Sequence, residues 1–124
     1  MEARKIIITG GATRIGAAIA RKLSGPGKEL IIHYNKSKLK AENLKKDLQK
    51  QGTIVYLVKG DLSKEKDIKR IIRFSKSKMK YFDCLINNAS LFEKLIWSYR
   101  FLPNFVIAQI FLSESIFLHV CQFL

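Results

Sequence analysis

The segment from Thr9 to Gly16, Thr-Gly-Gly-Ala-Thr-Arg-Ile-Gly, constrains the fold of this chain more than any other part of the sequence. It directly follows the apolar run Lys5–Ile8 and leads into a helix-like stretch from Ile15 to Leu23. Glycines let a backbone turn tightly and let a pyrophosphate approach, and the first turn of a helix presents free N–H groups to it. A strand, a glycine-rich turn and a helix in this order predict a dinucleotide-binding unit, if the rest of the chain provides the matching context.

Alternating strand-like and helix-like stretches over residues 1–94 provide that context. We expect strands at Lys5–Thr9, Glu29–Tyr34, Thr53–Lys59 and Phe82–Asn87. Each is a short apolar run, as is typical of parallel strands buried on both faces. The alternation predicts an α/β fold of the Rossmann type, a doubly wound parallel sheet with right-handed crossovers. The expected strand order is 3-2-1-4, and ligands should bind at the carboxyl ends of the strands.

The three expected helices each place apolar side chains on one face. These faces are Ile15, Ala18, Ile19 and Leu23 in the first helix, Ala41, Leu44 and Leu48 in the second, and Ile68, Ile71 and Ile72 in the third. The segments Gly25-Pro26-Gly27 and Gln51-Gly52 are helix stops, and Ser63 is the expected N-cap of the third helix.

Composition limits the class of protein. A chain of 124 residues with 48% hydrophobic residues is one domain at most and is not disordered. Cys84 and Cys121 form no disulfide framework and have no metal-ligand spacing, so no metal is expected. The first residues do not read as a signal peptide, and we therefore expect a cytoplasmic protein.

The net charge of +13 admits a nucleic-acid-binding protein as an alternative. The lysines, however, are spread over the expected helix surfaces and form no basic cluster interleaved with aromatic residues. We therefore interpret the charge as a solvated surface that also attracts an anionic cofactor, and we expect no nucleic-acid partner.

The chain changes character near Lys94. Residues 95–124 contain five of the eight phenylalanines, and their only charged side chains are Arg100 and Glu114. We expect an apolar, helical tail that follows a sheet truncated after four strands. A membrane span needs about 20 mostly apolar residues, and polar residues interrupt the stretch 105–124, so a span is not favoured. A third interpretation is that the tail is not native coding sequence but the product of a shifted reading frame.

The end of the second expected strand, His33 to Lys38, indicates which dinucleotide would bind. An NAD-binding unit carries an acidic residue about 20 residues beyond the glycine motif to bind the ribose hydroxyls. No acid is present here, and Lys36, Ser37 and Lys38 offer donors and positive charge instead. This favours the 2′-phosphate of NADP(H), although a lysine-rich helix start would have the same composition.

Two more motifs follow the third and fourth expected strands. Asp61, in Gly60-Asp61-Leu62-Ser63, could accept a hydrogen bond from an adenine amino group, or simply favour the N-terminus of the next helix. The amides of Asn87-Asn88-Ala89-Ser90 could join neighbouring strand ends and line the cofactor cleft.

Together these motifs resemble the cofactor-binding, N-terminal half of the short-chain dehydrogenase/reductase family, over residues 1–94. The family's Thr-Gly-x-x-x-Gly-x-Gly motif appears with Arg14 at its middle glycine, and its Asn-Asn-Ala-Gly motif appears with Ser90 in place of glycine. Both departures, and the His-Tyr-x-Lys-Ser segment at 33–37, are similar to pteridine reductases and their bacterial dihydrofolate/dihydromonapterin reductase relatives.

The resemblance implies roles for residues at all of these strand ends. The implied cofactor-binding residues are Gly10, Thr13, Arg14, Ile15, His33, Tyr34, Asn35, Lys36, Ser37, Asp61, Leu62, Asn88, Ala89 and Ser90. Arg14, Ser90 and Phe92 are the implied substrate contacts, with Phe92 stacked on a pterin ring. An intact relative would be a homo-oligomer acting on a pterin or folate.

The family's proton-transfer pair, Tyr-x-x-x-Lys, is not found where it should be. Its only occurrence is Tyr34–Lys38, where the cofactor phosphate should bind, and we interpret that as coincidence. No catalytic residue is assigned, so we expect an NADPH-dependent reductase fold that is inactive in this form. The alternatives are an NADP-binding module without catalysis and a short-chain dehydrogenase that reduces a carbonyl.

Overall fold

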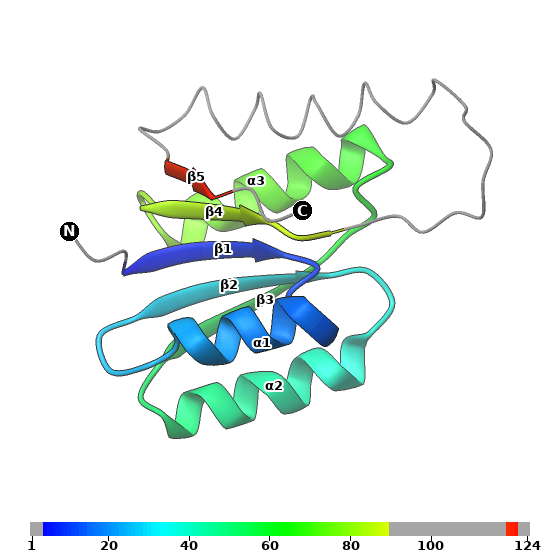
Figure 1. The fold of residues 1–124 in the computed structure, drawn as a ribbon. Coiled ribbons are helices and arrows are strands. Elements are labelled where there is room, and N and C mark those ends of the chain that lie inside the picture. Colours follow the sequence, from blue (N-terminus) through cyan, green and yellow to red (C-terminus); the bar gives the residue numbers. More distant parts are fainter. Residues whose placement is uncertain (1–3, 90–118, 122–124) are drawn as a thin grey trace.

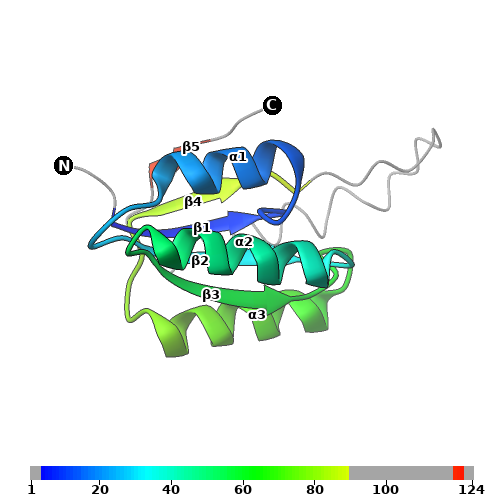
Figure 2. The same cartoon turned by 90° about the horizontal axis from the view of Figure 1, so that it is seen from below.

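The computed structural model describes residues 4–89 and 119–121. The described elements, in chain order, are β1 (Lys5–Thr9), α1 (Arg14–Leu23), β2 (Glu29–Tyr34), α2 (Lys38–Lys50), β3 (Ile54–Lys59), α3 (Glu65–Lys78), β4 (Cys84–Asn87) and β5 (His119–Cys121). Helices α1 and α2 cover one face of the sheet and α3 covers the other, so that the sheet is the middle layer (Figures 1 and 2).

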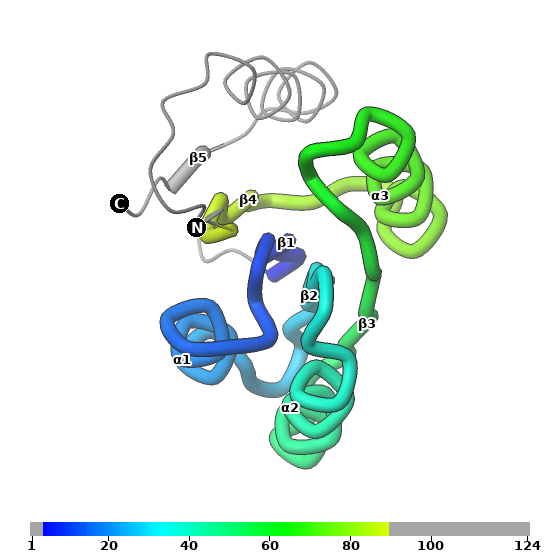
Figure 3. The backbone as a smooth tube through the Cα atoms, turned by 90° about the vertical axis from the view of Figure 1, so that its right-hand side faces the viewer, coloured from blue at the N-terminus to red at the C-terminus, as the bar shows by residue number. Residues whose placement is uncertain are grey.

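All strand pairs in the described sheet are parallel, in the order β3-β2-β1-β4-β5. The predicted order 3-2-1-4 and the predicted doubly wound fold are therefore confirmed, and Figure 3 shows the strands between the two helix layers. The fifth strand was not predicted: β5 pairs with β4 from Cys84↔His119 to Ile86↔Cys121. The expectation of a helical tail is wrong for these three residues, and the rest of the tail lies outside the described residues.

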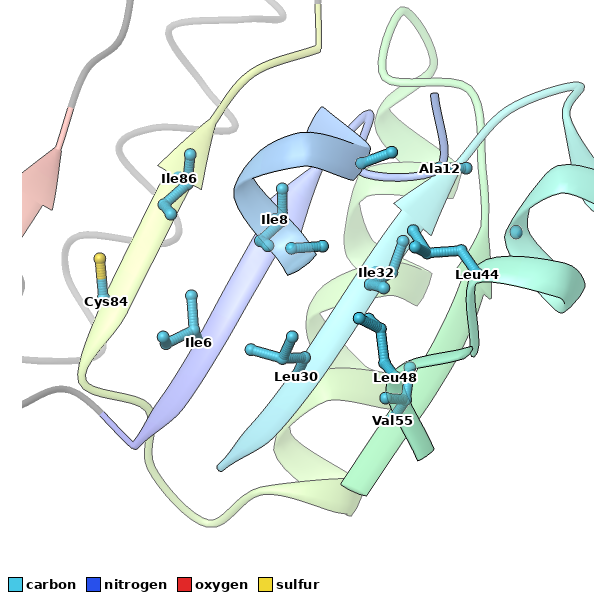
Figure 4. Close-up of a cluster of buried hydrophobic side chains, with 13 residues drawn as sticks. Ile6, Ile8, Ala12, Leu30, Ile32, Leu44, Leu48, Val55, Cys84 and Ile86 are labelled. Carbon is cyan, nitrogen blue, oxygen red and sulfur yellow. The ribbon is translucent and has the colours of Figure 1, made fainter. Parts of the chain in front are cut away.

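The two faces of the sheet carry separate hydrophobic cores because successive side chains of a strand point to opposite faces. Ile6 and Ile8 of β1 face α1 and α2, whereas Ile7 faces α3. Figure 4 shows the first core, in which Leu44 and Leu48 of α2 lie over the strands. Since β1 and β2 are buried on both sides, their sequences are continuous apolar runs rather than alternating ones.

Helix α1 buries a different stripe from the expected one. Gly16, Ala17 and Ala20 are its buried residues, whereas Ala18 and Ile15 are exposed. The expected face was therefore wrong, except for Ile19 and Leu23, which pack against the first core. Gly16 faces inward without a side chain because a Cβ there would collide with the turn after β1.

Helix α3 begins one residue later than an N-cap at Ser63 would allow. Its N-cap is Lys64, without a side-chain capping hydrogen bond. The hydroxyl and the amide of Ser63 both donate to Oδ1 of Asp61, at 2.6 and 2.9 Å, so this side chain closes the loop instead. The predicted strand starts at Thr53 and Phe82 are likewise replaced by Ile54 and Cys84.

The predicted faces of α2 and α3 agree with the structure. Ala41, Leu44 and Leu48 are buried in α2. Helix α3 buries Ile68 and Ile71, and the predicted Ile72 is partly buried against the second core. In the part of the chain that the structure describes, no helix is long and apolar enough to cross a membrane.

We expect the packing of the first core to contribute strongly to the free energy of unfolding. Two leucines of α2, one buried and one exposed, allow a matched test. Leu48 is fully buried and Leu39 is 69% exposed. Leu48→Ala should lower the free energy of unfolding by about 2 to 5 kcal/mol, because it removes apolar contacts and leaves a cavity. Leu39→Ala should change it by less than about 0.5 kcal/mol. Urea titrations of both variants check this, and equal losses would contradict the packing described.

Candidate functional site

The ends of β1 and β4 are joined by hydrogen bonds from the turn that follows each strand. The hydroxyl oxygen of Thr9 accepts the backbone N–H groups of Asn88 and Ala89, at 3.1 and 3.2 Å. The Asn88 side chain donates from Nδ2 to the carbonyl of Gly10, at 3.0 Å. The two motifs predicted to line one site therefore form one rigid unit.

Two glycines of the motif are required by close approach. A Cβ at Gly10 would lie 2.9 Å from the Cα of Ala89, and its φ of +61° is in the left-handed region. A Cβ at Gly16 would collide with the carbonyl oxygen of Gly10 and would lie 2.5 Å from Nδ2 of Asn88. The helix thus begins directly against the turn. We call the backbone of residues 10–16, at the carboxyl end of β1, the cradle.

Arg14 begins α1 in an unusual conformation. Its φ is +49°, and it is the one non-glycine residue with positive φ in the described part of the chain. A left-handed conformation costs an L-residue roughly 1 to 2 kcal/mol, so a glycine would adopt this backbone conformation with less strain. The exposed guanidinium therefore stands beside the helix N-terminus at the expense of some backbone strain.

The N-terminus of α1 is open to an anion. Thr13 is its N-cap but makes no side-chain capping hydrogen bond, and the first turn contains no acidic residue. The unpaired N–H groups of a first turn and the helix dipole both favour a negatively charged group at such a position. Ile15, in the same turn, is 66% exposed.

His33 was predicted to bind the cofactor, but the structure buries it beneath the turn. Only 2% of the residue is exposed. Its Nδ1 accepts the N–H of Gly10 at 3.1 Å, and its Nε2 lies 2.7 Å from the carbonyl oxygen of Gly60. Desolvation lowers the pKa of the imidazole below 6.5 and exceeds the opposing effects of the Gly60 carbonyl and the carboxylates of Asp61 and Asp67.

The end of β2 leads from the core to the surface. Tyr34 packs against the first core, and its carbonyl accepts the N–H of Gly60 at 3.0 Å. Asn35 is half-buried, and Ser37 is the N-cap of α2 without a side-chain capping hydrogen bond. The Ser37 hydroxyl therefore remains available at the start of the helix.

The N-terminus of α2 combines a helix dipole with lysines. Lys36 is exposed, and the first turn of α2 contains no acidic residue. Nζ of Lys38 lies 3.8 Å from Glu42 in a solvent-exposed pair, whereas Tyr34 lies against the core. Tyr34 and Lys38 thus have different partners.

The loop after β3 holds a carboxylate in a fixed orientation. The hydroxyl and the amide of Ser63 both donate to Oδ1 of Asp61. These two hydrogen bonds lower the pKa of Asp61, and the hydroxyl has the larger effect. The N–H of Asp61 donates to Oδ2 of Asp67 at 2.8 Å. This hydrogen bond, and to a lesser extent the nearby Arg70, lowers the pKa of Asp67. Oδ2 of Asp61 has no hydrogen bond within the described residues, and Leu62 packs against the second core.

Thr9, Gly16 and Asn87 were not among the predicted cofactor-binding residues. Thr9 and Gly16 lie inside the motif that was singled out, so the signal was present. The buried Asn87 side chain has no hydrogen-bond partner for its Nδ2 among the described residues. Ser90 and Phe92 lie outside the described residues, and no group of His, Cys, Asp and Glu within residues 4–89 is placed to hold a metal ion.

Comparison with known proteins places this arrangement in a family. Residues 4–102 match the short chain dehydrogenase family. The chain belongs to this family. It is 32% identical over 85 residues to the short-chain dehydrogenase/reductase homolog YusS of Bacillus subtilis, a match that covers 68% of this chain and 78% of that protein.

Solved structures of the family have the same fold. FolM alternative dihydrofolate reductase 1 from Brucella canis, complexed with NADP, is 25% identical with a TM-score of 0.75 over 90% of this chain and 48% of that one. A putative dehydrogenase from Burkholderia cenocepacia with bound NADP is 28% identical with a TM-score of 0.63, over 68% and 33% of the two chains. The chain thus spans half or less of the length of these two structures.

We expect Gly16 to be intolerant of a side chain. Alanine in place of glycine would by propensity stabilise a helix by about 1 kcal/mol. Here the added Cβ collides with backbone, so Gly16→Ala should instead lower the free energy of unfolding by about 1 to 3 kcal/mol. Gly60→Ala is the control, since its Cβ meets the movable Cδ1 of Ile71, and its loss should be smaller. Denaturant titrations check this, and a stabilised Gly16→Ala variant would contradict the close approach.

Proposed function

We propose that this chain contains the NADP(H)-binding part of a short-chain dehydrogenase that reduces a pterin or dihydrofolate. The observation that carries the proposal is a pair of helix N-termini, those of α1 and α2, which lack acidic residues in their first turns and carry Arg14, Lys36 and Lys38. Cations at the positive end of a helix are unfavourable by themselves. Phosphate groups at both positions would neutralise them.

The first position suits a pyrophosphate. Gly10 and Gly16 let the turn pack directly against the start of α1, and the first turn of that helix offers backbone N–H groups beside the turn. Arg14 would add a positive charge, and the apolar surface of Ile15 would be covered by the bound cofactor. Asn88 and Ala89 would hold the opposite side of the cradle.

The second position suits the phosphate on the adenosine ribose. Ser37 offers a hydroxyl that caps no helix, and Lys36 offers an exposed ammonium group. Lys38 can reach the same region if it leaves its exposed pair with Glu42, which is worth little in water. No acidic side chain of the first turn of α2 opposes the phosphate.

The adenine would lie at the loop after β3. Oδ2 of Asp61 is the acceptor that remains for an adenine amino group, because Ser63 occupies Oδ1. An aspartate is ionised at neutral pH, and the hydrogen bonds from Ser63 lower the pKa of Asp61 further. Leu62 and the backbone at Asn35 would border the ring.

The substrate proposal rests on the resemblance and on one similar structure. The Brucella canis protein is described as an alternative dihydrofolate reductase, and Arg14 stands where the family pattern has glycine. Arg14, Ser90 and Phe92 would contact the pterin. We propose that an intact protein of this kind is a homo-oligomer.

Bound NADPH supplies a hydride, and the reduced substrate also needs a proton. No tyrosine after Asn88 is followed by lysine four residues on in this sequence. The 124-residue chain would therefore bind cofactor without completing the reaction. Reduction of a carbonyl by a related protein is the second candidate, since the cofactor residues do not distinguish the two substrates.

We expect the chain to prefer NADPH to NADH. Replacing Lys36 and Lys38 together by alanine should weaken NADPH binding about five- to tenfold, because charge-assisted hydrogen bonds to the phosphate are lost. NADH binding should change by less than about twofold, since it lacks that phosphate. Titration calorimetry measures both. Replacing Lys46 and Lys50 together by alanine, farther along α2, removes the same amount of charge and serves as the control. Equal losses for the two cofactors would disprove the phosphate site.

We also expect no measurable NADPH-dependent reduction of dihydrobiopterin or dihydrofolate by the purified chain. The loss of general acid catalysis alone costs about 10²- to 10⁴-fold in rate. The measurement is NADPH oxidation followed by absorbance. Pterin-dependent oxidation that disappears in Phe92→Ala would show that this chain carries a complete active site.

A further inference from the structure

One imidazole links the two ends of the proposed cofactor site. Nδ1 of His33 accepts the N–H of Gly10 at 3.1 Å, in the turn proposed to hold the pyrophosphate. Nε2 lies 2.7 Å from the carbonyl oxygen of Gly60, in the loop proposed to hold the adenine. Since Gly60 offers a carbonyl and Gly10 offers an N–H, only the neutral ring with its proton on Nε2 satisfies both partners.

The surroundings of His33 hold both loops by further bonds. The carbonyl oxygen of His33 accepts the N–H of Gly11 at 3.0 Å, so one residue engages two successive amides of the turn. On the other side, the peptide between Gly60 and Asp61 accepts from the ring and donates to Oδ2 of Asp67 at 2.8 Å. The position of the Asp61 carboxylate thus depends on the same peptide that His33 holds.

These contacts assign the amides of Gly10 and Gly11 to the protein rather than to a ligand. A phosphate at the turn must therefore be bound by the first turn of α1, and its geometry depends on how His33 holds Gly10. We propose that His33 is a positioning residue, whose neutral Nε2–H tautomer sets the phosphate-binding turn and the adenine-binding loop in register, and that protonation of its Nδ1 weakens cofactor binding. This inference rests on the proposed NADP(H) site.

The direction of the pH effect follows from donor and acceptor roles. A proton on Nδ1 would face the N–H of Gly10, so two donors would oppose each other in a site with almost no exposure to water. The charged groups that act on the ring are the carboxylates of Asp61 and Asp67, and both favour protonation. Burial outweighs them and lowers the pKa of His33 below 6.5. Its stabilising contribution is therefore complete above pH 6.5 and is lost as the pH falls through the folded-state pKa.

Two neutral substitutions separate the two bonds of the ring. His33→Asn places an amide oxygen near the position of Nδ1 and keeps an acceptor for Gly10, whereas His33→Gln places an amide near Nε2 and keeps a donor for Gly60. In the full 124-residue chain at about pH 7.5, each variant breaks one of the two bonds that link the loops, so both should bind NADPH about three- to tenfold more weakly than the unmodified chain. Unchanged affinity in both variants would overturn the proposed role.

The pH profile provides a readout that a purely structural role would not produce. NADPH affinity of the unmodified chain should fall more steeply than that of His33→Asn between about pH 7.5 and pH 5. The variant corrects for titration of the cofactor's own phosphate, whose second pKa is about 6. Parallel profiles of the two proteins would overturn the proposal.

A cofactor-free measurement keeps this proposal separate from the proposed function. Nitrogen NMR of the His33 ring should show the proton on Nε2. As the ring becomes protonated, the Gly10 amide should lose protection against exchange, measured relative to an unprotected peptide at the same pH. A proton on Nδ1 at neutral pH, or an unchanged Gly10 amide, would overturn the role of His33. Absence of NADPH binding at every pH would instead disprove the proposed cofactor, while these signals would still decide whether His33 positions the turn.

Discussion

The contact between the turn after β1 and the end of β4 sets the positions of the polar groups described here. Thr9 accepts two amides from the end of β4, and Asn88 returns a hydrogen bond to Gly10. This exchange leaves no space for a side chain at Gly16, so α1 must begin within contact of the turn. The N-terminus of α1 therefore stands at the carboxyl ends of the central strands, where parallel α/β sheets bind ligands.

The strands and their order were predictable because burial on both faces leaves a strong sequence signal. β1 and β2 agree with the expected ranges to the residue, since apolar residues fill them and turn residues bound them. The buried face of α1 was not predictable from periodicity alone. Apolarity favoured Ile15 for the interior, but a close helix–sheet approach selects glycine and alanine instead. The start of α3 was misplaced because an N-cap serine accepts a helix N–H, whereas Ser63 donates its hydroxyl and its amide to Asp61 instead.

The candidate site was predictable as a set of residues and less so in their roles. Gly10 and Asn88 follow the neighbouring strands β1 and β4, and Asp61 follows β3, so all three lie at carboxyl ends of strands, as the motifs indicated. His33 carried the same signal, yet its partners are backbone groups of two loops. A sequence pattern marks a residue that a site requires without saying whether it touches the ligand. The pairing of β5 with β4 was also not predicted, because a strand of three residues does not stand out from the apolar sequence around it.

The left-handed backbone of Arg14 has a consequence for how this position can evolve. A glycine there would relieve strain and make the helix start more stable, but it would remove a cation from the edge of the cradle. Natural proteins accept such local losses where a side chain serves a ligand. At position 14, arginine thus provides a positive charge at the cost of folding stability. A replacement that restores stability should lose the charge, and one that keeps the charge should keep the strain.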